Sequence, residues 1–470
     1  MGILIDLAGR RKLTLIGGGG VRTPLFVEAA SRRAGTLGLE EIALFDTDTD
    51  RLSLLGAVSR YSARQSGGPR VTMTTDARAA MEGADFVVTA IRVGGDAGRV
   101  ADERIPLSHG VLGQETTGPG GFAMALRSVP AILEYAGLLA EVSPKAWLFN
   151  FTNPAGLVAQ ALHDAGHARA IGICDGANQA QYTVAAYLDR DPRDLRAEVY
   201  GLNHLSWTRA VTGPDGTELL ASLLGDENFR ARSSQRFFPP SLASLIGAWA
   251  NEYLWYYYFA DQAVARLTAA GQTRGEEVAA RNRALLDQLR AIDPDRDPAG
   301  ALAAYRAYEQ GRRSTYMHYA APGTAGDPPV PSAPSADGSE GSESSEGYAG
   351  VALELMEALV AGVPCHTAVN VPNSGAISGL ADDDVVEVST IADADGVRPV
   401  PLGAIPPSHL ALVRAVKLYE RLTVEAIRTR SRACAVRALM AHPLVLSYSR
   451  AEPLVDEFLR AHASLVGEWA

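Results

Sequence analysis

The sequence predicts an α/β protein in which a doubly wound parallel sheet is followed by an α+β domain. The first observation is that short apolar segments alternate with amphipathic helical patterns from Lys12 to about Asp175. Strands that are apolar throughout are typical of parallel sheets covered by helices on both faces. The second observation is that this alternation stops after Asp175, where longer helical patterns follow. A chain of 470 residues also has room for two or three domains.

Each expected element follows from its local pattern. In the first part, apolar segments that end at a glycine or a polar residue predict strands at 13–16, 42–45, 86–91, 147–151 and 170–174. The helical patterns between them cover 24–34, 48–64, 122–141, 155–165 and 177–188. In the second part we expect strands at 198–201 and 207–211 and helices at 240–260, 274–290, 349–361 and 407–441. These patterns predict a first domain at 1–195 and a second at 196–470.

One segment of the second part differs from the rest in composition. Residues 321–347 are rich in Pro, Gly, Ser, Asp and Glu and nearly lack large apolar side chains. Such a segment buries too little surface to offset its chain entropy. We therefore expect a disordered insertion on the surface of the second domain.

Composition and charge exclude several classes of protein. Apolar residues make up 47% of the chain and charged residues 21%, which supports a large buried core. The net charge of −11, with both signs interspersed, argues against nucleic acid or an anionic membrane as the main partner. We find no signal peptide and no membrane-spanning run, and three widely separated cysteines suit a reducing compartment. We expect a cytoplasmic protein.

A glycine cluster follows the first predicted strand. Gly17, Gly18, Gly19 and Gly20 lie between this strand and the next helix, where glycines let the backbone approach a pyrophosphate. Arg22 stands where the third glycine of the usual dinucleotide motif would be, so the cluster alone also suits an ordinary turn.

A carboxylate at the end of the second predicted strand strengthens this reading. Asp46 is placed to accept hydrogen bonds from the ribose and to disfavour NADP, although it could instead cap a helix. Together with the glycines, it predicts a Rossmann-type domain that binds NAD.

Polar clusters follow the later strands of the predicted sheet. They lie at 150–156, 174–176 and 201–204. Ligands of open α/β sheets bind at the carboxyl ends of the strands, so we expect these clusters to form one site beside the cofactor.

With these segments, the sequence resembles glycoside hydrolase family 4, the NAD- and metal-dependent glycosidases. The segments that carry the resemblance lie at 15–19 with Thr23 and Pro24, and at 45–46, 91–127, 153–156, 173–175, 201–204, 251–254, 369–373 and 418–426. Within the family the chain looks most like the 6-phospho-β-glucosidases. The resemblance implies that bound NAD⁺ takes hydride from C3 of the sugar, that a base removes the C2 proton, and that the glycosidic oxygen leaves by elimination. Water then adds and the hydride returns.

The resemblance also implies a metal ion, Mn²⁺ or another divalent ion, that polarises the C2 and C3 oxygens. Cys174 and His204 match the metal ligands of the family. Read without the resemblance, each is more often a core residue or a structural histidine.

Three further residues match catalytic positions of the family. Tyr253 matches the base, although Tyr256 and Tyr257 lie in the same aromatic run and such runs are often core. Glu115 matches a position that tunes the basicity of the tyrosine. Asp175 matches an acid that protonates the departing oxygen, or it is a capping or supporting carboxylate.

Substrate-binding positions of the family are matched by Arg99, Asn153 and Arg274. Arginines suit an anionic sugar phosphate, although each one alone could be a surface ion-pair partner. We expect a phosphorylated sugar as the substrate and a homo-oligomer, either a dimer or a tetramer. The same mechanism on an α-glycoside, a galactoside or an unphosphorylated sugar stays open. So do a lactate- or malate-type dehydrogenase and an inactive NAD-binding sensor.

Overall fold

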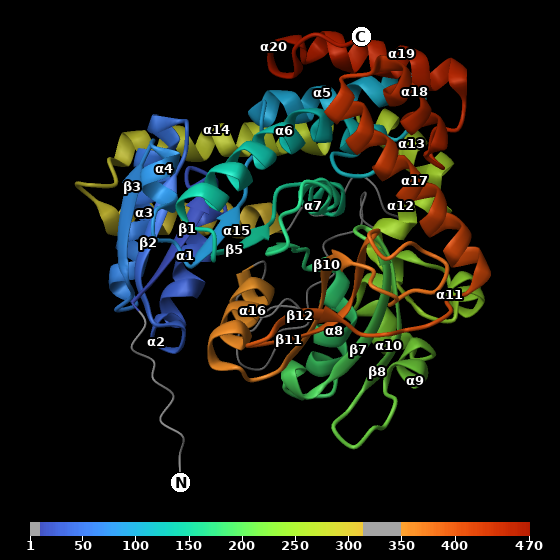
Figure 1. Ribbon diagram of the computed structural model, residues 1–470, viewed down its shortest axis with the longest axis horizontal. Helices are drawn as coiled ribbons and strands as arrows, with labels where there is room; N and C mark the ends of the chain where they lie inside the picture. Colours follow the sequence, from blue (N-terminus) through green and yellow to red (C-terminus); the bar gives the residue numbers. More distant parts are fainter. Residues whose placement is uncertain (1–9, 314–348) are drawn as a thin grey trace.

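The computed structural model describes residues 10–313 and 349–470, so the predicted insertion at 321–347 lies outside the described residues (Figure 1). A parallel sheet forms the N-terminal half, as predicted, although one of its six strands, Arg70–Thr74, was not expected from the sequence. Its order, β3-β2-β1-β4-β5-β6, reverses direction between β1 and β4. In such a sheet the ligand crevice lies at the carboxyl ends of the strands around this switch point. The strands are β1 (Arg11–Ile16), β2 (Leu39–Phe45), β3 (Arg70–Thr74), β4 (Phe86–Thr89), β5 (Trp147–Asn150) and β6 (Ala170–Gly172).

Helices cover both faces of this sheet. On one face α1 packs against α3, and on the other α6 packs against α4 and α7. The helices of this half are α1 (Thr23–Arg32), α2 (Ala34–Leu37), α3 (Thr49–Gln65), α4 (Ala77–Met81), α5 (Gly95–Ser108), α6 (Pro119–Val142), α7 (Ala155–Asp164), η1 (Gly176–Asn178), α8 (Gln179–Tyr187) and η2 (Pro192–Asp194).

The C-terminal half adds three antiparallel strands to the same sheet, which the sequence did not predict. They are β10 (Cys365–Pro372), β11 (Val385–Asp393) and β12 (Gly396–Pro399). Strand β10 joins β6 where Asn370 lies opposite Gly172. The resulting nine-stranded sheet draws strands from both sides of the expected boundary at 195, and the two-domain division stays a prediction.

A second, three-stranded antiparallel sheet lies beside the first. It contains β7 (Arg196–Leu202), β8 (Leu205–Thr212) and β9 (Trp249–Ala250). The short helices around it are α9 (Leu220–Leu224), α10 (Glu227–Ala231), η3 (Ser234–Phe237), α11 (Pro240–Ile246), η4 (Glu252–Leu254), α12 (Trp255–Tyr258) and α13 (Ala260–Ala269). This part, at 196–269, lies within the α+β domain predicted for 196–470.

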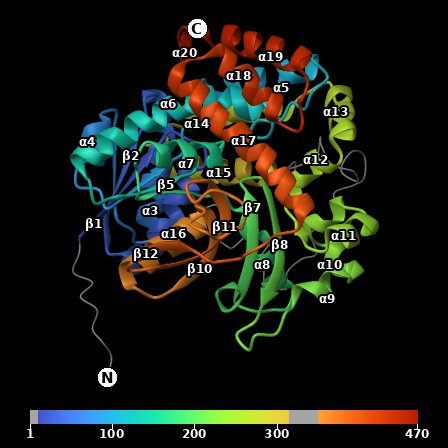
Figure 2. The same cartoon turned by 45° about the vertical axis from the view of Figure 1, so that its right-hand side comes forward.

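Longer helices of the C-terminal half pack back on the first half. Helices α14 (Arg274–Ile292) and α15 (Pro298–Arg313) contact α3, where Leu285 and Leu289 join Leu55 in a buried cluster. Helix α17 lies across α6 and α7, with α18 to α20 beyond it (Figure 2). The remaining helices are α16 (Gly350–Ala361), α17 (Pro407–Thr429), α18 (Arg432–Ala441), α19 (Tyr448–Ala461) and α20 (Ala463–Val466).

Two predicted helices are wrong as single elements. The helix expected at 240–260 ends at Gly247, which adopts φ +63, and the chain then pairs as β9 with β8. The helix expected at 407–441 breaks at Arg430, which adopts φ +49, and Ser431 caps a new helix. Both breaks depend on left-handed residues that a hydrophobic pattern does not reveal.

Helix α6 has the length and hydropathy of a membrane-spanning helix, yet 61% of that window is buried inside the protein. Burial of this kind is typical of a core helix, because its apolar surface is already covered by other elements.

Candidate active site

The glycine loop after β1 is packed too closely for any other residue type at its first position. Gly17 has φ +100, and a Cβ there would lie 2.6 Å from the carbonyl oxygen of Ala90. A Cβ on Gly18 would lie 2.7 Å from Cβ of Leu44. No side chain caps the N-terminus of α1, where Arg22 is the N-cap residue. The N–H groups of Gly17 to Gly20 hydrogen-bond within the protein, so the loop supplies the close backbone approach and the start of α1 supplies the positive end of the helix dipole for a pyrophosphate.

Asp46 lies beside this loop at the end of β2. One of its carboxylate oxygens accepts from the N–H of Gly19 at 2.8 Å, and the other accepts from the N–H of Asp48 at 3.0 Å. The cap of α3 is Asp48, which accepts from the N–H of Arg51. The structure thus assigns the capping role to Asp48 and places Asp46 against the glycine loop.

Cys174 and His204, 30 residues apart in the chain, meet at the carboxyl edge of the sheet. Cys174 follows β6, and His204 lies in the tight turn between β7 and β8 with φ +62. The distance between Cys174 Sγ and His204 Nε2 is 3.5 Å. Both side chains are buried, and burial lowers the pKa of His204 to about 4, so the imidazole is neutral at pH 7.

The other nitrogen of His204 is held by Thr116. His204 Nδ1 lies 3.0 Å from Thr116 Oγ1, and this hydroxyl lies 3.0 Å from Gln114 Oε1. Gln114 Oε1 also accepts from the N–H groups of Thr116 and Thr117, so it is the acceptor of this group. The Thr116 hydroxyl then donates to Gln114 and accepts from Nδ1–H of His204. This arrangement leaves Nε2, the nitrogen that faces Cys174, with its lone pair free to bind a metal.

The pair fits a metal ion that takes its remaining ligands from elsewhere. Typical metal bonds of about 2.3 Å to sulfur and about 2.0–2.1 Å to nitrogen allow one ion to touch two atoms that are 3.5 Å apart. Among residues 10–313 and 349–470, no three His, Cys, Asp or Glu side chains converge on one metal position. An ion here would therefore complete its coordination with substrate oxygens and water.

Tyr253 stacks on the imidazole of His204. Their ring centroids are 3.7 Å apart and the rings are nearly parallel, at 5°. Tyr256 is buried behind it, and Tyr257 packs on His442. The structure thus distinguishes Tyr253 from the other tyrosines of the aromatic run. Its backbone N–H donates to Asn251 Oδ1 at 3.0 Å, which fixes the short turn η4.

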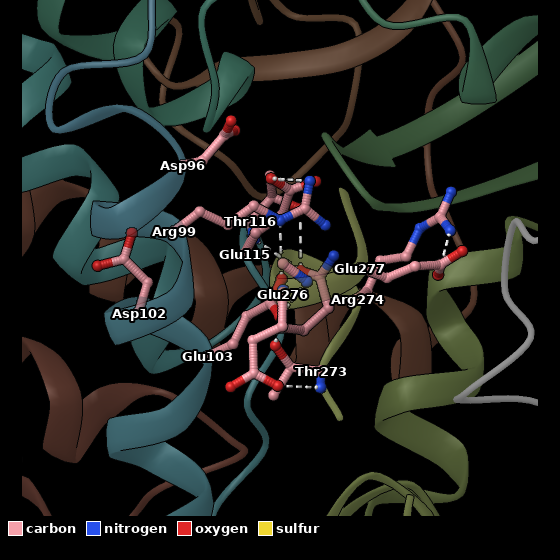
Figure 3. A network of polar contacts seen from close by, with 12 residues as sticks. Asp96, Arg99, Asp102, Glu103, Glu115, Thr116, Thr273, Arg274, Glu276 and Glu277 are labelled. Carbon is pink, nitrogen blue, oxygen red and sulfur yellow. Dashed lines mark hydrogen bonds and ion pairs between the residues drawn. The ribbon is translucent and has the colours of Figure 1, made fainter. Parts of the chain in front are cut away.

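A buried network of charges surrounds Arg99 on α5 (Figure 3). Arg99 contacts Glu103 at 2.9 Å and Glu115 at 3.1 Å, and Glu115 also contacts Arg92 at 2.6 Å. Burial alone would raise the pKa of Glu115, but Arg92 and Arg99 outweigh it and lower the pKa to about 2. Burial would likewise lower the pKa of Arg99, whereas Glu115, Glu103 and Tyr253 raise it. Both groups are therefore charged. Tyr253 is one of the residues that raise the pKa of Arg99.

Arg274 opens α14 next to the same network. The N–H of Gly275 donates to Glu103 Oε2 at 2.6 Å, and Thr273 and Glu276 form a capping box at this helix start. Arg274 itself contacts Glu277 at 2.6 Å. Glu103 thus contacts the side chain of Arg99 on α5 and the backbone at the start of α14, one residue after Arg274 (Figure 3).

Asp175 and Asn153 lie at the same edge of the sheet. Asp175 Oδ1 is 3.9 Å from Cys174 Sγ, and its side chain does not cap the turn η1. Asn153 follows β5 and precedes Pro154, which lines a small cavity together with Thr116 and Asn203. Asp175 and Asn153 therefore follow β6 and β5 at the carboxyl side of the sheet.

Sequence reasoning missed several supporting residues. Gln114, Thr116 and Arg92 belong to segments that carry the resemblance, yet no pattern separates them from their neighbours. Glu103, one turn after Arg99 on a helix, carried a usable signal, because oppositely charged residues four apart face each other.

Comparison with known proteins gives a consistent result over nearly the whole chain. The family model described as family 4 glycosyl hydrolase matches residues 12–190, and the model for the C-terminal domain of that family matches residues 199–445. The chain is 30% identical over 467 residues to a probable 6-phospho-β-glucosidase of Bacillus subtilis, covering 97% of this chain and 98% of that protein.

Two solved structures are similar in fold, each with a TM-score of 0.81. One is the 6-phospho-β-glucosidase of Thermotoga maritima with manganese, NAD⁺ and glucose-6-phosphate, at 26% identity and covering 97% of this chain and 99% of that one. The other is a 6-phospho-α-glucosidase from gut microorganisms with NAD and Mn²⁺, at 25% identity and covering 98% of this chain and 100% of that one.

Proposed function

The chain belongs to glycosyl hydrolase family 4, and we propose that it hydrolyses 6-phospho-β-glucosides with NAD⁺ and a divalent metal ion. The observation that carries the proposal is the convergence of three side chains at the carboxyl edge of the sheet. Tyr253 stacks on His204, and His204 Nε2 faces Cys174 Sγ at 3.5 Å. A simple dehydrogenase has no need of this cysteine and histidine.

The chain's own residues divide between the two cofactors. Gly17, Gly18, Gly19 and Asp46 bind NAD⁺, while Cys174 and His204 bind the metal ion, which is Mn²⁺ or another divalent ion. When bound, NAD⁺ supplies a hydride acceptor for C3 of the sugar, and the metal supplies a Lewis acid at the C2 and C3 oxygens.

Tyr253 is the base that removes the proton from C2. Its ring stacks on the proposed metal ligand His204, which places the phenol beside the metal site, and Arg99 interacts with it electrostatically. Glu115 is held by Arg92 and Arg99, so it acts on Tyr253 through Arg99.

Asp175 then protonates the glycosidic oxygen as that bond breaks, and water adds at C1 afterwards. The position of Asp175 next to a metal ligand, with no capping bond, supports this role. Arg99, Arg274 and Asn153 hold the sugar and its phosphate. The two arginines are fixed by carboxylates before the substrate arrives, which lowers the entropy lost on binding.

A substrate panel tests the proposal. The reduced enzyme with NAD⁺ and Mn²⁺ should release nitrophenol from p-nitrophenyl-β-glucoside 6-phosphate, and deuterium at C2 should slow turnover if proton removal limits the rate. The α-linked, galacto and unphosphorylated analogues are the comparison arms, since elimination tolerates either anomer and one similar structure is an α-glucosidase. A preference for the α-linked substrate would correct the anomer, and no release from any of them would overturn the hydrolase assignment.

Two variants connect this activity to the site. Tyr253→Phe should lose nearly all turnover and keep Mn²⁺ binding, because the phenol oxygen is the base and not a metal ligand. Cys174→Ser should lose Mn²⁺ binding and turnover together. Full activity of Cys174→Ser in the presence of a chelator is the result that contradicts the metal assignment.

We further propose that the enzyme works in the cytoplasm as a homo-oligomer, a dimer or a tetramer. Its three cysteines are free, which suits a reducing compartment. Leu245, Leu446 and Tyr448 are at least half exposed, and large exposed apolar side chains of this kind occur at interfaces. Light scattering coupled to gel filtration gives the mass of the assembly. The mass of a monomer would contradict the proposed homo-oligomer.

A further inference from the structure

Glu387 on β11 is a buried carboxyl group to which the mechanism assigns no role. Its side chain is 0% exposed. Among the described residues, no lysine, arginine or histidine lies within ion-pair distance of it. Burying a carboxyl group without a cation is costly unless hydrogen bonds compensate for its lost hydration.

Three side chains donate to Glu387, and two of them flank His204 in the turn between β7 and β8. Asn203 Nδ2 donates to Oε1 at 3.1 Å, and Ser206 Oγ donates to Oε2 at 2.8 Å. Asn370 Nδ2, on the neighbouring strand β10, lies 3.4 Å from Oε1. Asn203 and Ser206 stand on either side of His204 in the chain. Glu387 therefore holds both ends of the turn that presents this histidine, and it does so from a different sheet.

The first branch leads from Glu387 through Asn203 to the metal histidine. Asn203 directly precedes His204, so the bond from its Nδ2 to Glu387 Oε1 at 3.1 Å fixes the turn that presents the imidazole. Groups that orient metal ligands in this way tune their geometry and basicity.

The second branch leads from Glu387 through Ser206 to the tyrosine. Ser206 Oγ accepts from Asn251 Nδ2 at 3.4 Å while it donates to Glu387. Asn251 in turn fixes the backbone of Tyr253 through its Oδ1. Glu387 is therefore the first residue of two hydrogen-bonded paths. One path positions the metal histidine, and the other positions the stacked tyrosine.

We propose that Glu387 is a positioning residue that holds His204 and Tyr253 in one arrangement beside Cys174. The inference rests on the proposed function in taking Cys174 and His204 as the ligands of the metal. It predicts that loss of the carboxylate weakens Mn²⁺ binding through the Asn203 branch and lowers kcat through the Ser206 branch. NAD⁺ binding should not change, because the glycine loop lies at the end of β1 and contacts none of these residues.

Glu387→Gln is the principal variant, because glutamine keeps the shape and one acceptor oxygen but loses the second acceptor. Ser389→Ala is the matched control. Ser389 lies two residues further along β11 on the same face, and its hydroxyl bridges β7 by accepting from the N–H of Val199 and donating to the carbonyl of Ala197, both at 2.7 Å. Ser389→Ala loses two bonds between β11 and the second sheet, and neither of them involves the turn that presents His204.

Binding is measured on the full-length, reduced, NAD⁺-loaded protein by titrating Mn²⁺ and following the EPR signal of the free ion. We expect Glu387→Gln to bind Mn²⁺ about 10–100-fold more weakly, and Ser389→Ala to bind within about twofold of the parent protein. At saturating Mn²⁺, Glu387→Gln should lower kcat and leave KM within about twofold. Equal Mn²⁺ affinities for Glu387→Gln and the parent, or equal losses in both variants, would overturn the inference.

Two single-branch variants keep the test decisive if Glu387→Gln does not fold. Asn203→Ala should weaken Mn²⁺ binding, because one end of the turn that presents His204 is released. Ser206→Ala releases the other end and should in addition lower kcat at saturating Mn²⁺, because it also loses the bond to Asn251. Parent-like Mn²⁺ affinity of both variants would contradict the positioning role. A parent protein that binds no Mn²⁺ would instead refute the metal assignment of the proposed function, so the two failures are distinguishable.

Discussion

At the scale of single residues, the hydroxyl of Thr116 decides which nitrogen of His204 faces the metal position. It accepts from Nδ1 only because Gln114 already takes its proton. Thr116→Val keeps the shape and removes the hydroxyl, so the imidazole can place its proton on Nε2. We expect Mn²⁺ to bind about 10–100-fold more weakly, as measured by EPR titration. Thr116→Ser is the control and should bind nearly as well as the parent; equal binding by the valine variant would refute the tautomer argument.

Glu115 provides a test that depends on pH. Its pKa in the folded protein is about 2, below the ordinary value of 4.5. A carboxyl group with a lowered pKa contributes stability above its unfolded pKa and loses that contribution as the pH falls through the folded value. Glu115→Gln should therefore lower the free energy of unfolding at pH 7 by about 1–3 kcal/mol, and the difference should shrink between pH 4.5 and pH 2.

Urea unfolding at pH 7 and pH 3.5 measures this difference. Glu82→Gln, at an exposed glutamate, is the control and should change little at either pH. A difference between the parent and Glu115→Gln that is the same at both pH values would show that charge pairing is not its cause.

The residues of the site were predictable to different degrees. The glycine loop and Asp46 follow from local sequence, because a strand, a turn and a helix must adjoin. Cys174 and His204 are 30 positions apart, and only the resemblance paired them. Thr116 could not be predicted, because its role depends on which atom its hydroxyl faces.

At the scale of elements, the turn between β1 and α1 depends on Gly17. Gly17→Ala would force a side chain to adopt φ +100 and would place its Cβ 2.6 Å from the carbonyl oxygen of Ala90. Strain of about 1–3 kcal/mol in this loop corresponds to roughly 10–100-fold weaker NAD⁺ binding. Isothermal titration with NAD⁺ measures the change.

Gly35→Ala is the matched control for this variant. Gly35 lies in α2, and a Cβ there meets no atom within 4 Å. We expect NAD⁺ affinity to be unchanged and stability to rise by about 0.5–1 kcal/mol. Unchanged NAD⁺ binding by Gly17→Ala would contradict the role assigned to the loop.

Elements were predictable where burial and periodicity agree. Strand β1 reads as an apolar run because all of 13–16 is buried. Helix α5 was missed, since it begins at Gly95, directly after Gly94, and contains Pro106. Strands β10 and β11 were missed as well: they carry the buried polar residues Asn370 and Glu387, which interrupt the apolar pattern of a core strand.

At the scale of the whole molecule, the nine-stranded sheet joins segments that are far apart in the chain. Strand β10 pairs with β6 across nearly 200 residues, through Asn370 and Gly172. Local patterns predicted the parallel core of the sheet. They could not predict this addition, because edge pairing between distant strands depends on tertiary contacts and leaves no period in the sequence.

The C-terminal helices are joined to the first half by a buried cluster of three charged or polar side chains. Arg127 on α6 pairs with Asp102 on α5 at 2.7 Å, and neither side chain is exposed to solvent. His462, which follows α19, contacts the same carboxylate at 2.9 Å. Asp102 directly precedes Glu103, the partner of Arg99, so the cluster lies one residue from the charge network of the site.

Removing one member of this cluster should cost stability in proportion to the charge left unpaired. Asp102→Asn leaves Arg127 buried without its partner and should lower the free energy of unfolding by about 3–5 kcal/mol. His462→Ala leaves the ion pair intact and should cost about 1–3 kcal/mol, because a buried acceptor loses one of its donors. Urea unfolding measures both losses, and NAD⁺ and Mn²⁺ affinities of His462→Ala should stay within about twofold of the parent. If His462→Ala were as costly as Asp102→Asn, the histidine and not the arginine would be the main partner of Asp102. If it also weakened NAD⁺ or Mn²⁺ binding, the C-terminal helices would be part of the site and not only of its scaffold.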